Sequence, residues 1–268
     1  MNKKTRLGLW VCLILLGGAS ALCRASLQPT PSDPREELET FLREADITAV
    51  EKMHQHGRTN AWLVTLSDGT ATRRAFFKSI RRSRPAIMPD SCAYELAAYE
   101  LDKLLGLGLV PATVERSIEG RAGSLQLFLD GVETEKSRLN KNLRPPDPQA
   151  YGDRLDEILV LEHLVFAPRQ DLGDVIFQTD SWRPMRVDFS EAFAPSAELL
   201  TDYPLRRCSR RVLASLSDEW DDDAVRARLK SLLNAEELEA LLQRRLLLLN
   251  EIKRLIAEKG EAAVLYRP

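Results

Sequence analysis

The patterning of the sequence changes at a proline-rich segment, residues 143–148. Before this segment, apolar and polar residues alternate over short runs that end at turn-forming pairs such as Asp68-Gly69, which is typical of strands. After it, apolar residues recur every three or four positions over long stretches, which is typical of helices. This order predicts an α+β fold with two lobes: a small antiparallel sheet with one internal helix, and a mostly helical second lobe.

The same periodicities place the individual elements. The run that ends at Gly106 and Gly108 is predicted to be the helix inside the first lobe, preceded by an irregular loop up to Pro89. Helices are predicted at 35–45, 91–105, 151–166, 204–216, 222–233 and 235–259, and strands within 47–72 and at 73–80, 110–118, 123–129, 175–177 and 187–190.

The first residues have the pattern of a secretion signal. Three basic residues within the first six precede the apolar stretch 7–16, which is shorter than the roughly 20 residues that cross a membrane. Small residues at 19–21 offer a cleavage site after Ala21. We expect residues 1–21 to be a signal peptide and the protein to be exported, either periplasmic or secreted.

Two alternatives keep the N-terminus at a membrane. The signal could remain uncleaved as an anchor, or Cys23 could carry a lipid, although Leu22 stands where a small residue is usual. We expect no other attachment to a membrane. Residues 22–34 are rich in proline and polar side chains and are predicted to be a linker to the folded part.

The charge of the chain is nearly balanced, with 38 Lys and Arg against 40 Asp and Glu. No global field therefore favours nucleic acid, and we expect no nucleic-acid partner. Arginine clusters at residues 73–84 and 206–211 are expected on solvated faces, with phosphate contact as the alternative.

Two cysteines, Cys92 and Cys208, lie in the predicted folded part. Neither belongs to a C-x-x-C pair, so we expect no metal site on them. An oxidising compartment would permit a disulfide between them. Because they are far apart in the sequence, we expect each to be buried singly and keep the disulfide as the alternative.

Lys78 ends an apolar strand and needs a partner of opposite charge. Alternation places Phe76 and Lys78 on one face of the strand and Ala75 and Phe77 on the other. Glu95, early in the following helix, is the expected partner. In kinases a Lys–Glu pair of this kind positions an ammonium group on nucleotide phosphates. On these residues alone, a surface lysine and an unrelated helix-start glutamate remain the alternative.

The residues around Glu95 belong to an ordered set of motifs. Residues 94–107 read YELAAYELDKLLGL, residues 110–114 read VPATV and residues 123–128 read GSLQLF. In this order they resemble the atypical kinase-like superfamily, in particular bacterial relatives of HipA, of the phosphatidylinositol 3- and 4-kinases, and of the secretory-pathway kinases that include four-jointed and the Golgi casein kinase. The resemblance implies a two-lobed protein-kinase-like fold, with an N-lobe at 35–130 and a helical C-lobe at 131–268.

The resemblance also implies roles for single residues. Lys78, Glu95 and Gln126 would bind ATP. The loop after the long helix departs from the family pattern N-x-D-R-H-x-G-N, because residues 167–174 read APRQDLGD. Arg169 stands where the proton-accepting aspartate is expected, and a guanidinium group stays protonated. Asp171, two residues further on, is the candidate replacement for this base.

Two further aspartates are candidate metal ligands. Asp174 and Asp188 lie at opposite ends of one predicted hairpin, so the turn should bring both carboxylates to the same end. Carboxylate oxygens suit Mg²⁺ or Mn²⁺ held together with nucleotide phosphates, and the resemblance implies this role. The alternative is that Asp174 caps a turn and Asp188 binds backbone amides.

Together these residues predict an exported kinase-like protein that binds ATP, with weak or absent phosphoryl transfer: a kinase-like phosphotransferase or a pseudokinase. The acceptor of phosphate stays open between a protein, a lipid and a sugar. The alternative is an exported binding or scaffold module that uses the same fold without nucleotide. Phe76 is the residue to inspect for this alternative, because it shares a strand face with Lys78 and its ring could fill the adenine site.

Overall fold

The computed structural model describes residues 33–53, 61–84, 87–167 and 171–267. Residues 33–268 form one compact unit. The predictions on the signal peptide, on Cys23, on most of the linker and on Arg169 lie outside the described residues. The division into lobes at residue 130 stays a prediction.

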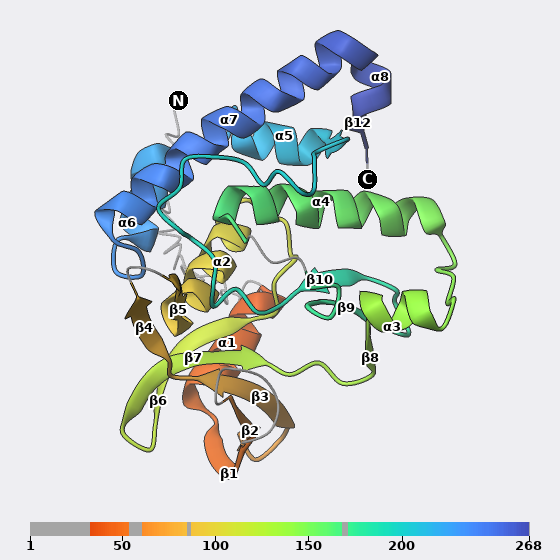
Figure 1. Cartoon of the computed structure of the whole chain (residues 1–268). Coiled ribbons are helices and arrows are strands. Elements are labelled where there is room, and N and C mark those ends of the chain that lie inside the picture. Colours follow the sequence, from red (N-terminus) through yellow and green to blue (C-terminus); the bar gives the residue numbers. More distant parts are fainter. Residues whose placement is uncertain (1–32, 54–60, 85–86, 168–170, 268) are drawn as a thin grey trace, which may run out of the picture. The chain divides into compact units, whose positions relative to one another are not determined.

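The first part of this unit is a five-stranded antiparallel sheet in the order β1-β2-β3-β7-β6 (Figure 1). Burial alternates along β2 and along the second half of β3, as a sheet with one buried face requires. The strands are β1 (Asp46–Lys52), β2 (Trp62–Ser67), β3 (Thr72–Lys78), β6 (Thr113–Ile118) and β7 (Arg121–Leu127). The predicted hairpin turn between β6 and β7 is confirmed, with Glu119 and Gly120 both at positive φ.

The register of β3 against β7 decides which side chains share a face. Phe76 pairs with Gln126 and Lys78 pairs with Ser124. Directly opposite residues of an antiparallel pair point to the same side, so Phe76, Lys78 and Gln126 share one face. Ala75 and Phe77 lie on the other face, where both are buried in the core. The predicted alternation along this strand is confirmed.

Two helices accompany the sheet, α1 (Pro34–Glu44) and α2 (Cys92–Leu104). The Ser91 hydroxyl accepts a hydrogen bond from the Ala93 amide at 3.2 Å and caps α2, which ends before Gly106 at φ 62°. The apolar side of α2 is buried in the core, as predicted. The predictions of helices at 35–45 and 91–105 are confirmed to within a residue or two.

The second part is mostly helical, and its long helices α4 and α7 pack against each other (Figure 1). A three-stranded sheet in the order β10-β9-β8 contacts α3 and α4. The helices are α3 (Glu135–Asn140), α4 (Pro148–Val165), α5 (Arg210–Leu216), α6 (Asp222–Leu229), α7 (Ala235–Lys259) and α8 (Glu261–Val264), and the strands are β8 (Val132–Thr134), β9 (Val175–Gln178), β10 (Pro184–Arg186), β11 (Cys208–Ser209) and β12 (Leu265–Tyr266).

Three predictions of secondary structure were wrong. The expected loop before α2 contains a hairpin, β4 (Arg81–Arg84) with β5 (Ile87–Ser91), and a two-stranded ribbon tolerates Pro89 because it has free edges. Residues 187–190, predicted to be a strand, lie beyond the end of β10 at Arg186, since Asp188 has φ 61° and cannot continue a strand. The helix predicted from residue 204 begins only at Arg210.

Cys92 and Cys208 are both buried and free, so the expected single burial is confirmed. Within the described ranges, none of the helices has the length and apolar character needed to cross a membrane.

Candidate functional site

Lys78 and Glu95 meet as predicted. Lys78 is the last residue of β3 and Glu95 lies in the first turn of α2, and Lys78 Nζ donates to Glu95 Oε1 at 2.6 Å. Only 2% of the Glu95 side chain is exposed, so the ion pair is shielded from water. The second Glu95 oxygen accepts a hydrogen bond from the Phe189 amide at 3.0 Å. The glutamate is therefore held at both oxygens.

Asp188 is a second partner of the same ammonium group. Lys78 Nζ lies 2.8 Å from Asp188 Oδ1. Burial alone would lower the pKa of Lys78, but the two carboxylates raise it above its usual value, so the ammonium group stays charged. Burial likewise would raise the pKa of Asp188, yet Lys78 holds it below its usual range. Asp188 is therefore ionised, with 45% of its side chain exposed.

Asp174 reaches the same end of the β9–β10 hairpin. The Val187 amide donates to the Asp174 carbonyl at 2.9 Å and closes the hairpin there. Burial raises the pKa of Asp174 to about 6; Arg186 opposes this rise, and the charges of Asp188 and Asp171 add to it. The prediction that one turn gathers both carboxylates agrees with this geometry.

Asp90, which sequence reasoning missed, adds a further carboxyl group beside Asp188. Its Oδ1 is buried without a hydrogen-bond partner among the described residues. Burial raises the pKa of Asp90, and the negative charges of Glu191 and Asp188 raise it further. Asp90 and Asp188 are far apart in the sequence and become neighbours only in the folded chain, at the start of α2. No local motif surrounds Asp90, so the sequence carries no signal of this contact.

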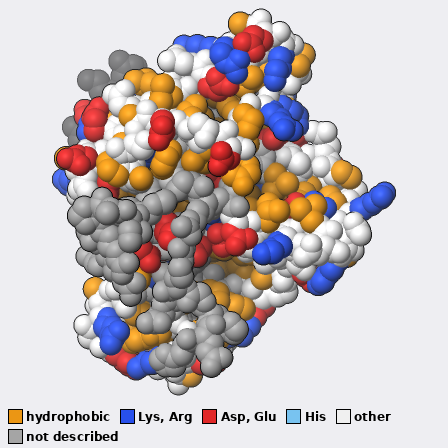
Figure 2. All heavy atoms as spheres, viewed as in Figure 1, with side chains coloured by type: hydrophobic (Ala, Val, Ile, Leu, Met, Phe, Trp, Pro, Cys, Tyr) orange, Lys and Arg blue, Asp and Glu red, His pale blue; other side chains and the backbone are white. Residues whose placement is uncertain are grey.

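This group of carboxylates is suited to a hard divalent cation. Burial and the neighbouring carboxylates both raise the pKa of Asp174 and Asp90; a cation would offset the repulsion among the carboxylates and would give the buried Asp90 oxygen a partner. Within the described residues, no group of three or more His, Cys, Asp or Glu is arranged to hold a metal alone. Phosphate oxygens would have to complete the coordination. Figure 2 shows acidic side chains near the middle of one face, beside atoms that are not described.

Gln126 lies on the Lys78 face but is already engaged. Its Nε2 donates to Thr113 Oγ1 at 3.0 Å, and the Thr113 hydroxyl in turn donates to the Pro111 carbonyl. Phe76, on the same face, packs against Phe128 with ring centroids 5.2 Å apart. Both residues are where the strand pattern predicts them.

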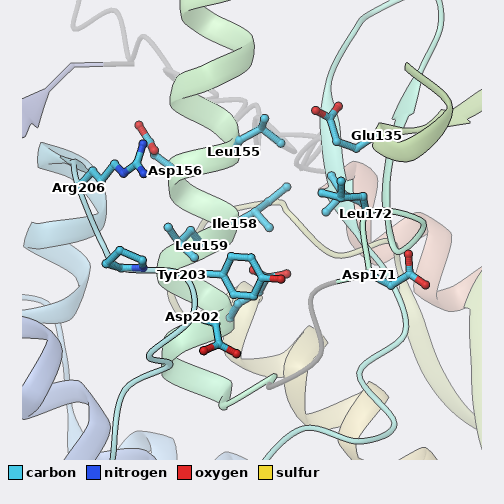
Figure 3. Close-up of a pocket in the computed structure, with 13 residues that line it drawn as sticks. Glu135, Leu155, Asp156, Ile158, Leu159, Asp171, Leu172, Asp202, Tyr203 and Arg206 are labelled. Carbon is cyan, nitrogen blue, oxygen red and sulfur yellow. The ribbon is translucent and has the colours of Figure 1, made fainter. Parts of the chain in front are cut away.

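Asp171, the candidate base, caps a turn. Its Oδ1 accepts a hydrogen bond from the Gly173 amide at 2.8 Å, and its carbonyl accepts one from the Asp174 amide. Figure 3 shows Asp171 at the edge of a cavity of about 310 Å³, across from the α4 residues Leu155 and Ile158. The carboxylate that would serve as a base is therefore occupied in ordering its own loop.

Arg186 connects β10 with α4 and with the backbone beside Asp188, a role that sequence reasoning also missed. Its side chain is almost fully buried, and its Nε donates to Glu162 Oε1 at 2.8 Å. Its Nη1 donates to the backbone carbonyl of Val187, next to Asp188. An arginine in a short apolar strand gives no signal of this role in the sequence.

No family model and no curated protein matches this sequence. Two solved structures are similar in fold. The structure of hydra Fam20 with sugar superimposes with a TM-score of 0.68 at 16% identity, covering 89% of this chain and 94% of that one. The Helicobacter pylori proinflammatory kinase CtkA gives a TM-score of 0.50 at 10% identity, covering 83% of this chain and 97% of that one. The fold is therefore a two-lobed kinase-like fold, and at this identity the similarity extends to the fold alone.

Proposed function

We propose that this chain binds ATP with Mg²⁺ or Mn²⁺ around Lys78 and transfers phosphate weakly or not at all. The observation that supports this most is the placement of one ammonium group between the buried Glu95 and the half-exposed Asp188. A buried lysine held by a helix glutamate is the arrangement that positions nucleotide phosphates in kinases.

Each residue has a separate role in this proposal. Glu95 fixes the direction of Lys78, whose ammonium group binds phosphate oxygens. Asp174 and Asp188 hold the divalent cation, which when bound neutralises phosphate charge. On binding nucleotide, Lys78 would exchange its 2.8 Å contact with Asp188 for phosphate oxygens. Gln126 borders the nucleotide from β7.

Weak transfer follows from the loop sequence. Arg169 occupies the position of the base and cannot accept a proton. One carboxylate oxygen of Asp171 accepts a hydrogen bond from the Gly173 amide, which makes Asp171 a poor replacement for the missing base. General base catalysis contributes about 10²- to 10⁴-fold, whereas positioning and charge stabilisation supply much of phosphoryl transfer. Residual turnover is therefore expected to be slow, toward a protein, lipid or sugar acceptor.

The proposal places this activity outside the cytoplasm. The basic and apolar N-terminal pattern of residues 1–21 supports export through a signal peptide. The linker and the two lobes then form the mature protein, with lobes at residues 35–130 and 131–268. Membrane attachment would come only from an uncleaved signal or a lipid on Cys23.

A second candidate is a scaffold module that binds no nucleotide. The observation that favours it is that the charged groups proposed to bind nucleotide and metal already have partners. Lys78 has Glu95 and Asp188, and Asp174 lies 3.5 Å from Arg186. In this reading the ion pairs stabilise the contact between lobes, and the Phe76–Phe128 pair fills the space of an adenine ring.

Thermal unfolding with and without nucleotide separates the two candidates. ATP with Mn²⁺ is expected to raise the melting temperature of the wild-type protein, because a ligand of the native state stabilises it. Lys78→Met and Asp188→Asn should lose this rise. Asp180→Asn, in the exposed β9–β10 turn, is the control and should keep it. Absence of any nucleotide effect on the wild-type protein would favour the scaffold.

A further inference from the structure

A cavity that the proposed nucleotide site does not use lies beside the start of α4. Its volume is about 750 Å³, within the usual range for small-molecule sites. The first turns of α4, the turn between β9 and β10, and the start of α5 all contribute to its walls. Its arginines are Arg154, Arg183, Arg211 and Arg267, and we refer to it as the arginine cavity.

Two arginines that line the arginine cavity, Arg154 and Arg183, lie near Arg35 beside Gly108. A Cβ atom placed on Gly108 would lie 3.1 Å from Nη2 of Arg183, 3.1 Å from Nη2 of Arg35 and 3.7 Å from Nη2 of Arg154. Like charges so close repel one another unless anions offset them. Burial lowers the pKa of Arg154, and the nearby charge of Arg183 lowers it further.

The carboxylates around the cavity already have other partners. Asp102 pairs with Arg35 at 2.7 Å, and Glu157 pairs with Arg154 at 3.0 Å and with Arg211 at 3.2 Å. Asp153 pairs with Arg207 at 2.8 Å, and Asp147 accepts hydrogen bonds from the first amides of α4. Glu157 and Asp153 are thereby paired with arginines, and Asp147 is engaged by backbone amides.

Arg183 takes part in none of these ion pairs. Among the described residues, neither a hydrogen bond nor an ion pair reaches its exposed guanidinium group. Arg267 at the far end of the chain also lines the cavity and is exposed. Trp182 provides a flat apolar wall, because its ring stacks on Phe177 with centroids 4.9 Å apart. The cavity thus combines spare positive charge with an aromatic surface.

We propose that the arginine cavity binds a small ligand through a phosphate or sulfate group, which Arg183 holds with Arg267 while the body of the ligand lies against Trp182. Guanidinium groups bind such oxyanions with two parallel hydrogen bonds, which suits an exposed arginine that has no other partner. None of Lys78, Glu95, Asp174 and Asp188 lines this cavity, so the inference is independent of the proposed nucleotide site.

Thermal unfolding of the full chain in metal-free, low-salt buffer tests this site. Inorganic phosphate and sulfate are added as probes, with chloride at equal ionic strength as the reference. Both oxyanions are expected to raise the melting temperature of the wild-type protein above the chloride value. Arg183→Gln should bind them at least about tenfold more weakly, because a hydrogen bond to a charged group is lost. Arg226→Gln, on the exposed face of α6, should respond as the wild-type protein does.

The same variant distinguishes a ligand site from a structural role. Without added oxyanion, Arg183→Gln should unfold at the same temperature as the wild-type protein or higher, because repulsion at Gly108 is relieved. Lys78→Met should keep the full response to phosphate. Equal responses of Arg183→Gln and wild type, loss of the response in Lys78→Met, or no response of the wild-type protein to either oxyanion would overturn the inference.

Discussion

At the scale of the residue, two buried side chains, Glu95 and His163, each have polar contacts at both of their polar atoms. Glu95 accepts from Lys78 with one oxygen and from the Phe189 amide with the other. His163, in α4, accepts from the Leu200 amide at Nδ1 and lies 2.9 Å from the Tyr203 carbonyl at Nε2. The second contact requires a proton on Nε2, so the neutral imidazole is fixed in one tautomer.

Glu95→Gln should lower the free energy of unfolding by about 1–3 kcal/mol, because a buried charged partner of Lys78 is removed while the side chain keeps its shape. Urea unfolding measures this loss. The matched control is Glu258→Gln, an exposed ion pair with Arg254 on α7, which should change stability by about 0–1 kcal/mol. Equal effects of the two substitutions would contradict a buried role for Glu95.

His163 should make stability depend on pH. Burial lowers its pKa below the usual value of 6.5, and a proton on Nδ1 would face the Leu200 amide. The unfolded chain therefore takes up the proton more readily, so the stability from neutral His163 is present above pH 6.5 and is lost as the pH falls through the lowered pKa. Over this pH range, the free energy of unfolding measured with urea should fall more steeply for the wild-type protein than for His163→Gln. Parallel pH dependences of the two proteins would exclude this role.

At the scale of the element, β3 and β7 must approach closely for Lys78 to reach α2. Gly123 in β7 permits this, because a Cβ there would meet the backbone carbonyl of Lys78 and lie 2.7 Å from the Phe77 ring. Neither of these groups is the free end of a flexible chain. The pairing of the strand that carries Lys78 therefore depends on the missing side chain of Gly123.

Gly123→Ala should reduce the free energy of unfolding by about 1–3 kcal/mol, because the added methyl group overpacks the contact of β7 with β3. Gly152→Ala is a control of the same chemistry within α4, where a Cβ would meet nothing within 4 Å. That substitution should instead stabilise the protein by about 0.5–1 kcal/mol, because alanine favours a helix. Thermal or urea unfolding of the two variants gives the result, and a neutral or stabilising Gly123→Ala would count against the close approach.

The elements differ in how much of them the sequence predicts. Helix α2 is predicted to within a residue because its apolar repeat ends at Gly106 and begins at the capping residue Ser91. The β4–β5 hairpin and the short α3 are too short for a periodic pattern; the hairpin is formed by pairing of its own two strands, and α3 packs against β8 and β9. For the site, Lys78 with Glu95 follows from strand and helix pattern, whereas Asp90 becomes a neighbour of Asp188 only through a tertiary contact. Arg186 is close to Asp188 in the sequence, but the pattern does not indicate that its side chain folds back onto the backbone there.

At the scale of the whole molecule, the kinase-like fold and the N-terminal signal are separate inferences. The fold is shown by the two lobes and by the similarity to Fam20 and CtkA structures. Export rests only on the basic and apolar residues at the start of the chain. Each can therefore be tested without the other.

Cleavage after Ala21 predicts the mass of the mature protein. When the full chain is expressed in a bacterium, the protein in the periplasmic or culture fraction should begin at Leu22, as read from its intact mass or N-terminal sequence. Retention of the full-length chain at the membrane would instead indicate the uncleaved anchor, and a lipid-modified Cys23 would indicate a lipoprotein.

The most direct test of the central claim is a crystal structure of the protein with Mn²⁺ and a non-hydrolysable ATP analogue. Anomalous scattering locates the metal independently of the nucleotide. We predict a manganese peak in contact with both Asp174 and Asp188, with Lys78 on the phosphates and still paired with Glu95. A site that stays empty at saturating nucleotide, with Lys78 still bound to Asp188, would contradict it.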